Sequence, residues 1–240
     1  MADSLDTQRS HDTQDSHDSL HTHRDFGETP LDESDLDADP FVQFQVWLGE
    51  AEGAGLSEPN AMVLSTVDAE GTPSSRTVLL RGVRAGGFEF FTNYDSRKGR
   101  ALGEHPVASA LFPWYLLQRQ VIIEGSVERV SAAESDAYFA GRPYKSQIAA
   151  IASAQSQPLG ARADLERRVA ELGAAHPEGG PVPRPEHWGG YRLIPSRIEF
   201  WKGRRSRLHD RLVYTPAPDT LDGPSSTPDA RSWQVTRLQP

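Results

Sequence analysis

Two arginines, a histidine and an aspartate occupy the five-residue segment Arg207-Leu208-His209-Asp210-Arg211. In an extended chain, successive side chains point to opposite faces of a sheet. Arg207, His209 and Arg211 would then share one face, and Leu208 would point toward the core. Groups that carry positive charge, or can acquire it, repel one another unless an anion lies against them. The segment therefore indicates a phosphate or another anionic ligand. The alternative is a solvated charged strand that happens to contain a histidine.

A second candidate anion site is the run from Thr92 to Lys98, which combines a strand end, a turn and a helix start. Free backbone N–H groups and the helix dipole attract anions at a helix start. The hydroxyl groups of Thr92 and Ser96 add donors, and Arg97 and Lys98 add positive charge. The glycines of a P-loop are missing. The alternative is an ordinary capped helix with exposed basic residues.

A third cluster consists of Tyr138, Arg142 and Ser146. Tyr138 and Arg142 are four residues apart in an expected helix, so they share a face. A phenol, a guanidinium and a hydroxyl group could together hold a small phosphate. A Tyr–Arg stack on a helix surface would give the same pattern.

The strand segment Arg76-Thr77-Val78-Leu79-Leu80-Arg81 has an arginine at each end. Because side chains alternate along a strand, Arg76 and Arg81 point to opposite faces and could each bind a different anion. Charged residues also make edge strands soluble, which is the alternative.

Polar and aromatic residues elsewhere could complete such sites. Gln120, Gln155 and Ser156 could bond the edge of a heterocycle or a phosphate, or could simply lie in polar loops. Trp201 could pack on a planar cofactor or fill the core. The histidines lack HExxH spacing, and no serine lies in a nucleophile elbow, so neither a metal site nor covalent catalysis is expected.

The elements expected to position these residues are helices and strands with short connections. Asp39 and Pro40 mark a helix start, and Ser131 with Glu134 forms a capping box. Expected helices cover 40–53, 96–104, 131–141, 143–151 and 159–172, and expected strands cover 61–67, 76–84, 88–92, 107–117, 120–130, 191–194, 198–201, 210–214 and 233–238. This order favours a mainly β barrel or sandwich with flanking helices.

The formal net charge of the 240-residue chain is −9, but it is unevenly distributed. Residues 1–40 hold twelve acidic residues and two arginines, so the rest of the chain is nearly neutral. Clustered arginines in a near-neutral body indicate anionic small molecules rather than nucleic acid. The chain has no cysteine, no long apolar run and no secretory signal, so we expect a cytoplasmic protein without a membrane partner.

The acidic N-terminal tail, residues 1–22, is expected to be disordered because it is nearly free of large apolar residues. Four of the eight histidines lie in or next to this tail (His11, His17, His21 and His23), but their spacing is loose for a metal site. Residues 23–240 are expected to form a single domain, with 216–230 as a polar surface loop.

Many short motifs resemble, in order and spacing, the pyridoxamine 5'-phosphate oxidase family: Arg76–Arg81, Phe91-Thr92-Asn93, Ser96-Arg97-Lys98, Leu111–Trp114, Arg119-Gln120-Val121, Tyr138-Phe139, Arg142-Pro143, Ser146-Gln147-Ile148, Gln155-Ser156, Trp188-Gly189-Gly190, Ile198–Trp201, Arg207–Arg211 and Arg237–Pro240. The resemblance covers roughly residues 24–240. It implies an FMN-binding split β-barrel that works as a homodimer with FMN at the subunit interface. It also implies oxidation of pyridoxamine and pyridoxine 5'-phosphates to pyridoxal 5'-phosphate, with O₂ as acceptor and H₂O₂ as product.

The resemblance further implies a role for each matching residue. Residues around FMN would be Arg76, Thr77, Val78, Leu79, Leu80, Phe91, Thr92, Arg97, Lys98, Gln120, Gln155, Ser156, Trp201 and Arg211. Residues at the substrate phosphate would be Arg81, Tyr138, Arg142 and Ser146. Arg207 and His209 would hold the pyridine ring as catalytic residues, with Leu208 between them in the substrate site.

Two positions depart from the family pattern. Arg81 stands where the family usually has lysine, so a planar fork replaces a point charge. The N-terminal segment that often closes over the substrate reads Arg-Arg-Glu-Tyr in familiar members and His23-Arg24-Asp25-Phe26 here, so Phe26 lacks a hydroxyl group.

Two other functional classes are open. A flavin or deazaflavin reductase with the same barrel would share the FMN-binding residues but would not need Tyr138, Arg142, Ser146, Arg207 and His209 together. A non-enzymatic carrier of flavin or pyridoxal phosphate would need both anion sites but no turnover with O₂.

Overall fold

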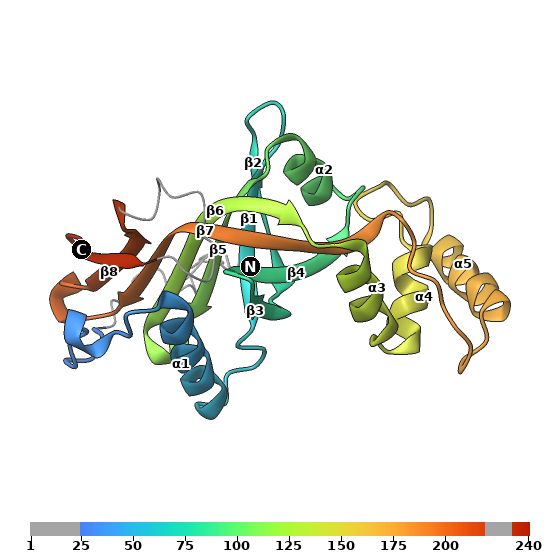
Figure 1. Cartoon of the computed structure of the whole chain (residues 1–240). Coiled ribbons are helices and arrows are strands. Elements are labelled where there is room, and N and C mark those ends of the chain that lie inside the picture. The colour runs from blue at the N-terminus through green and yellow to red at the C-terminus, as the bar shows by residue number, and fades with distance from the viewer. Residues whose placement is uncertain (1–24, 219–231) are drawn as a thin grey trace, which may run out of the picture.

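The computed structural model describes residues 25–218 and 232–240. Within these residues, one antiparallel sheet has the order β2-β1-β5-β6-β7-β4-β3, and β8 pairs with β7 and β9 (Figure 1). Its strands are β1 (Ala61–Val67), β2 (Pro73–Leu79), β3 (Gly82–Arg84), β4 (Gly87–Asn93), β5 (Val107–Trp114), β6 (Arg119–Arg129), β7 (Trp188–Lys202), β8 (Asp210–Pro216) and β9 (Trp233–Arg237). The predicted tail and most of the predicted 216–230 loop lie outside the described residues.

Strand β7 changes partners along its length and thereby curls the sheet. Its first six residues pair with β4 and its last five pair with β8, while β6 pairs with it along the other edge. Between these halves the register with β6 shifts at Glu124/Gly125, beside Pro195. A β-bulge of this kind bends the strand and increases its twist. The two ends of β7 therefore belong to different parts of the sheet.

Gly125 allows this close crossing, because a Cβ at this position would lie 1.9 Å from the Ile194 carbonyl oxygen. We expect Gly125→Ala to lower the free energy of unfolding by about 1–3 kcal/mol, since the clash is with backbone. Urea unfolding at one fixed protein concentration checks this. Gly103→Ala is the matched control, because no atom lies within 4 Å of the added Cβ. Equal stability of the two variants would contradict the prediction.

Helices flank the sheet on two sides. Helix α1 (Pro40–Gly53) begins where Asp39 accepts a hydrogen bond from the Phe41 N–H at 2.8 Å. It buries Phe44, whose ring centroid lies 5.0 Å from that of Phe88. Helix α2 (Arg97–Glu104) follows β4, and α3 (Ala132–Ala140), α4 (Tyr144–Ala152) and α5 (Arg162–Ala175) gather at the opposite end of the molecule from α1 and β8 (Figure 1).

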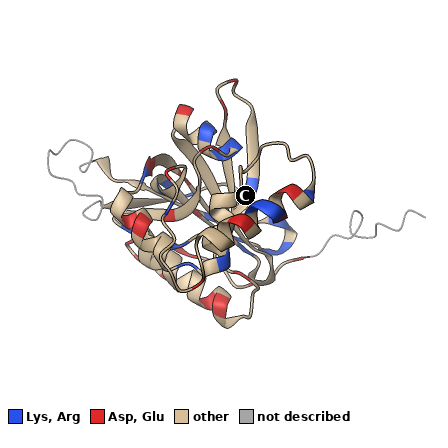
Figure 2. Ribbon diagram, turned by 90° about the vertical axis from the view of Figure 1, so that its right-hand side faces the viewer, with Lys and Arg blue, Asp and Glu red and all other residues tan. Residues whose placement is uncertain are grey.

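Charge is mixed over the part of the chain that the structure describes. Figure 2, which looks at the end that carries α3, α4 and α5, shows acidic and basic residues interspersed along the ribbon. No helix within the described ranges is long and apolar enough to cross a membrane.

The predicted mainly β architecture with flanking helices is confirmed, but two strand predictions were wrong. The segment 76–84 is not one strand, because β2 ends at Leu79 to pair with β1, and β3 begins at Gly82 to pair with β4. The segments 191–194 and 198–201 are not separate, because both belong to β7.

The segment 207–211 is not fully extended, which corrects a third prediction. Ser206 and Arg207 have φ angles of 56° and 61°, and strand β8 starts only at Asp210. Leu208 is 68% exposed, so it does not point into the core. A tight turn therefore carries the histidine that precedes the strand.

Candidate active site

One group of predicted site residues meets at a cavity of about 260 Å³ bordered by β2, β4, α2 and α3. Its lining includes Thr77, Val78, Leu79, Arg81, Phe91, Thr92, Lys98, Tyr138, Arg142 and Gln155. An adjoining cavity of about 330 Å³ shares Phe91, Thr92, Arg142 and Gln155 with it and adds Ser146. The structure therefore brings these residues together from six separate segments of the chain.

Lys98 is the most buried cation of this group, with 7% of its surface exposed. Its Nζ donates to Gln155 Oε1 at 2.6 Å and to Ser96 Oγ at 3.3 Å. Burial and the nearby charge of Arg76 lower the pKa of Lys98 to about 8. A buried ammonium group whose partners are neutral is suited to an anionic ligand.

Arg76 and Arg97 extend the positive charge around Lys98. Burial and the charge of Arg97 lower the pKa of Arg76, whose guanidinium donates to the Leu64 carbonyl and the Thr66 hydroxyl. Arg97 is half exposed and lies 3.7 Å from the Asp68 carboxylate. Arg97 and Lys98 are the first two residues of α2, where backbone N–H groups also favour an anion, and Arg76 adds its charge from β2.

Arg142 lies at the junction of the two cavities. Its Nη1 is buried, and within the described residues this atom has no hydrogen-bond partner. Burial lowers the pKa of Arg142, and the charge of Arg81 adds to this effect while Tyr138 opposes it. An unpaired N–H on a buried guanidinium costs about 1–3 kcal/mol. An acceptor from a ligand would offset this cost.

Aromatic stacking fixes the side chains beside Arg142. The Tyr138 ring lies 3.7 Å from that of Phe91, centroid to centroid, at an interplanar angle of 7°. The Arg142 guanidinium lies 4.6 Å from the centroid of the Trp188 ring. Tyr138 and Arg142 both line the smaller cavity, so these contacts hold the phenol and the guanidinium at its wall.

A second group of predicted residues lies at the far end of β7. Gln120, Trp201 and Arg211 are directly opposite one another on β6, β7 and β8, so their side chains share one face of the sheet. The His209 ring lies 4.7 Å from the Trp201 ring, and the Phe26 ring packs edge-on against both.

Glu199 orients the arginine of this row. Arg211 binds the Glu199 carboxylate through two hydrogen bonds of 2.7 and 3.0 Å, and Arg197 adds a third of 2.6 Å. Burial raises the pKa of Glu199, but these hydrogen bonds outweigh burial and hold its pKa below the usual range. The carboxylate is therefore ionised and holds Arg211 in one orientation.

The two groups do not meet within one chain. None of Gln120, Trp201, His209 and Arg211 lines either cavity. Trp188 borders both cavities and starts β7, whereas Trp201 lies thirteen residues further along the same strand. An extended strand of this length spans roughly 40 Å. Four other predicted residues line neither cavity: Arg76, Arg97, Leu80, which is buried in the core, and Ser156, which is exposed with a φ of 70°.

Residues 48–186 match the family model described as pyridoxamine 5'-phosphate oxidase, and residues 188–240 match the pyridoxine 5'-phosphate oxidase C-terminal dimerisation region. Over 215 residues, the chain is 52% identical to the pyridoxine/pyridoxamine 5'-phosphate oxidase of Burkholderia mallei, covering 90% of this chain and 95% of the relative. The chain belongs to the pyridoxamine 5'-phosphate oxidase family. The oxidase of Paraburkholderia phytofirmans is also 52% identical, over 88% of this chain and 93% of its own.

Solved structures agree with this family assignment. PhzG from Burkholderia lata, in complex with tetrahydrophenazine-1-carboxylic acid, is 33% identical with a TM-score of 0.78 and covers 89% of this chain and 99% of its own. An FMN-binding protein from Nostoc punctiforme, related to pyridoxamine 5'-phosphate oxidase, is 14% identical with a TM-score of 0.66 and covers 85% and 100%. The predicted split β-barrel fold is thereby confirmed.

Sequence reasoning missed two residues of this candidate site. Trp188 lines both cavities, and Glu199 orients Arg211. The two glycines after Trp188 were the signal for that residue, because adjacent glycines can mark a place where the backbone packs closely against other groups. A Cβ on Gly189 would lie 2.1 Å from the Tyr94 hydroxyl. An acidic residue within the apolar run of β7 was the signal for Glu199, since buried charges require partners.

Proposed function

We propose that the chain oxidises pyridoxamine 5'-phosphate and pyridoxine 5'-phosphate to pyridoxal 5'-phosphate, with FMN as cofactor, O₂ as acceptor and H₂O₂ as product. The observation that carries the proposal is the pair of cationic groups at adjoining cavities, one around Lys98 and one around Arg142. A flavin phosphate and a substrate phosphate need two such groups. The relatives from B. mallei and P. phytofirmans are named as pyridoxine/pyridoxamine 5'-phosphate oxidases, which supports the same reaction.

The residues near Lys98 fit the FMN phosphate, because the buried ammonium has neutral partners and two further cations stand beside it. We assign the phosphate to Arg97, Lys98, Gln155 and Ser156. The other proposed FMN-binding residues are Arg76, Thr77, Val78, Leu79, Leu80, Phe91, Thr92, Gln120, Trp201 and Arg211. When bound, FMN supplies a two-electron acceptor that O₂ can reoxidise.

The residues near Arg142 fit the substrate phosphate. We assign this phosphate to Arg81, Tyr138, Arg142 and Ser146, which offer two guanidinium groups and two hydroxyl groups. The unpaired Nη1 of Arg142 gives one N–H that a phosphate oxygen would satisfy. Holding both reactants by their phosphates makes the reaction effectively unimolecular, which contributes roughly 7–11 kcal/mol at its limit.

The remaining proposed residues come from a second copy of the chain. Trp201, Arg207, His209 and Arg211 all lie in the segment that matches the dimerisation region. Within one chain they are remote from both cavities, although the assigned roles require contact with the same ligands. In a homodimer, the far end of β7 from one subunit would complete the cavities of the other. These residues could then contact the same ligands although they lie far from the cavities of their own chain.

An absorbance spectrum of the purified protein tests this function. We expect a flavin band that bleaches when pyridoxamine 5'-phosphate is added without oxygen and returns with peroxide when air is admitted. Pyridoxamine without its phosphate is the matched control and should bleach the band far more slowly. A flavin band that neither B6 phosphate bleaches would reject the proposal and favour a reductase or an oxidase of another substrate, such as the ligand of PhzG.

FMN binding is expected to weaken as the pH rises above about 8. Burial favours the neutral amine of Lys98 and lowers its pKa to about 8, so the ammonium form predominates only below that pH. If the phosphate requires the ammonium, the Kd for FMN rises by about tenfold per pH unit above the pKa. Fluorescence titration of apoprotein between pH 7 and 9 measures this. Lys98→Arg should flatten the profile, and an unchanged slope would contradict the assignment.

A further inference from the structure

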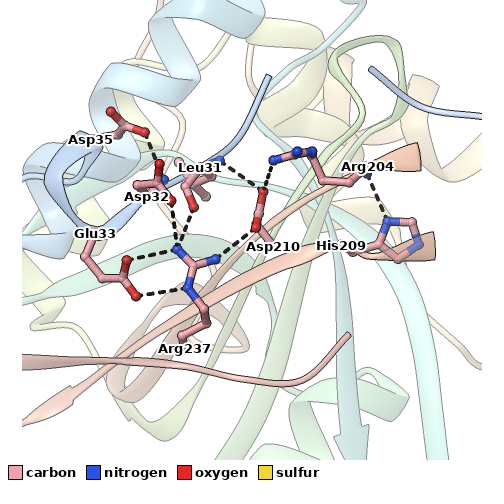
Figure 3. A network of polar contacts seen from close by, with 8 residues as sticks. All are labelled: Leu31, Asp32, Glu33, Asp35, Arg204, His209, Asp210 and Arg237. Carbon is pink, nitrogen blue, oxygen red and sulfur yellow. Dashed lines mark hydrogen bonds and ion pairs between the residues drawn. The ribbon is translucent and has the colours of Figure 1, made fainter. Parts of the chain in front are cut away.

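A network of ion pairs joins the two ends of the described chain beside the proposed active-site histidine (Figure 3). The Asp210 carboxylate, 13% exposed, accepts from Arg237 Nη1 at 2.9 Å, from Arg204 Nη1 at 3.1 Å and from the Leu31 N–H at 3.0 Å. Arg237 also binds the Glu33 carboxylate through two hydrogen bonds of 3.0 and 2.9 Å. Asp210 is therefore fixed from three directions.

The same network reaches the His209 ring. The backbone N–H of Arg204 donates to His209 Nδ1 at 3.0 Å. Arg204 therefore binds both residues: its side chain binds Asp210, and its backbone N–H binds His209. Arg204 cannot rotate its peptide unit away from the imidazole without disturbing its ion pair with the carboxylate.

The turn that carries these groups is held at several other points. The Gly203 N–H donates to the Gln118 carbonyl at 2.8 Å, and the Ser206 N–H donates to Asp25 Oδ1 at 3.1 Å. Ser206 and Arg207 adopt left-handed φ angles, which cost free energy for residues other than glycine. Such a conformation persists when the surrounding contacts determine it, and here the bonds to Gln118 and Asp25 act together with the ion pair between Arg204 and Asp210.

The hydrogen bond at Nδ1 decides where His209 carries its proton. A neutral imidazole has one N–H and one acceptor nitrogen. Because Nδ1 accepts the Arg204 N–H, the proton lies on Nε2. Among the described residues no group bonds to Nε2, so this N–H is available to a ligand.

We infer that Asp210 is a positioning residue for His209: through Arg204 it keeps the ring in the Nε2–H form, so that His209 donates a hydrogen bond to the substrate and does not act as the base. The role toward substrate rests on the proposed oxidase function, whereas the protonation state does not. The pKa of His209 agrees, because burial and the charge of Arg207 lower it and only Asp210 opposes them.

Nitrogen NMR of the full-length, FMN-loaded protein with labelled histidine tests the inference without measuring activity. The His209 signal is identified by its loss in His209→Gln. We expect an unprotonated Nδ1 and a protonated Nε2 at pH 7. A proton on Nδ1, or an imidazolium, at this pH would overturn the inference.

Asp210→Asn tests the positioning role. We expect the single tautomer to give way to a mixture and kcat to fall by up to about 100-fold while FMN remains bound. Arg237→Gln removes a different partner of the same carboxylate and should give a weaker change in the same direction, so it serves if Asp210→Asn does not fold. Arg162→Gln, at an exposed arginine paired with Glu166 on α5, should leave the His209 spectrum unchanged.

The outcomes separate this inference from the proposed function. If Asp210→Asn and Arg237→Gln both fold and keep the wild-type His209 tautomer, the positioning role is wrong. If wild-type protein has the expected tautomer but oxidises neither B6 phosphate, the proposed function is wrong and the protonation state of His209 stands.

Discussion

Replacing Arg142 by methionine is expected to lower kcat/KM for pyridoxamine 5'-phosphate by about 10²–10³-fold. The guanidinium has a buried N–H without a partner in the described chain, Trp188 packs against it, and Phe91 stacks on the neighbouring Tyr138. Removing one partner of a buried, hydrogen-bonded charge pair costs about 2–5 kcal/mol, and each 1.4 kcal/mol is a factor of ten. Steady-state kinetics with varied substrate concentration measures the loss.

Two controls make this result specific to the phosphate. Lys145→Met removes one positive charge three residues away, from an exposed position on α4, and should change kcat/KM little. Pyridoxamine, which lacks the phosphate, should be oxidised equally slowly by Arg142→Met and by the wild type. An equal loss with both substrates would mean that Arg142 supports the fold rather than the substrate phosphate.

Replacing Arg207 by alanine is expected to lower kcat by about 10²-fold or more while FMN stays bound. In the proposed site Arg207 holds the pyridine ring, so its loss disturbs the alignment of the reacting atoms, and misalignment of about 1 Å costs such a factor. Turnover and the flavin band of the same sample are measured together. Arg97→Ala should show the reverse, with weakened FMN binding, because Arg97 belongs to the cationic group around Lys98. Loss of flavin from Arg207→Ala would show that Arg207 belongs to the FMN site and not to the substrate site.

A mixed dimer of Arg142→Met and Arg207→Ala tests whether the site is shared between subunits. If each site combines the cavity of one chain with the Arg207 turn of the other, one site of the mixed dimer has both residues intact and activity returns to about half of the wild-type value. Two differently tagged chains, co-expressed and purified through both tags, provide the sample. If the two residues act within one chain, every site keeps one lesion and no activity returns.

Local sequence signals predicted the helix starts well. Asp39 before Pro40, and Ser131 with Glu134, cap α1 and α3 in the structure as expected, because a cap involves residues only two or three positions apart. The run from Thr92 to Lys98 likewise brings its cations to a helix start without help from distant residues. The family resemblance was carried by such short motifs, and the family match agrees with it.

The sequence by itself thus determined the mainly β class, the helix caps and the family, and it supplied the candidate phosphate-binding residues. Only the tertiary structure decided how these residues are grouped. The change of partner along β7 separates Trp201 from Trp188, and the left-handed Ser206 and Arg207 direct the Arg204 N–H to His209. Strand pairing joins residues up to about a hundred positions apart, and strained φ angles persist only under contacts from distant segments. Neither long-range strand pairing nor a strained φ angle leaves a periodic or local pattern in the sequence.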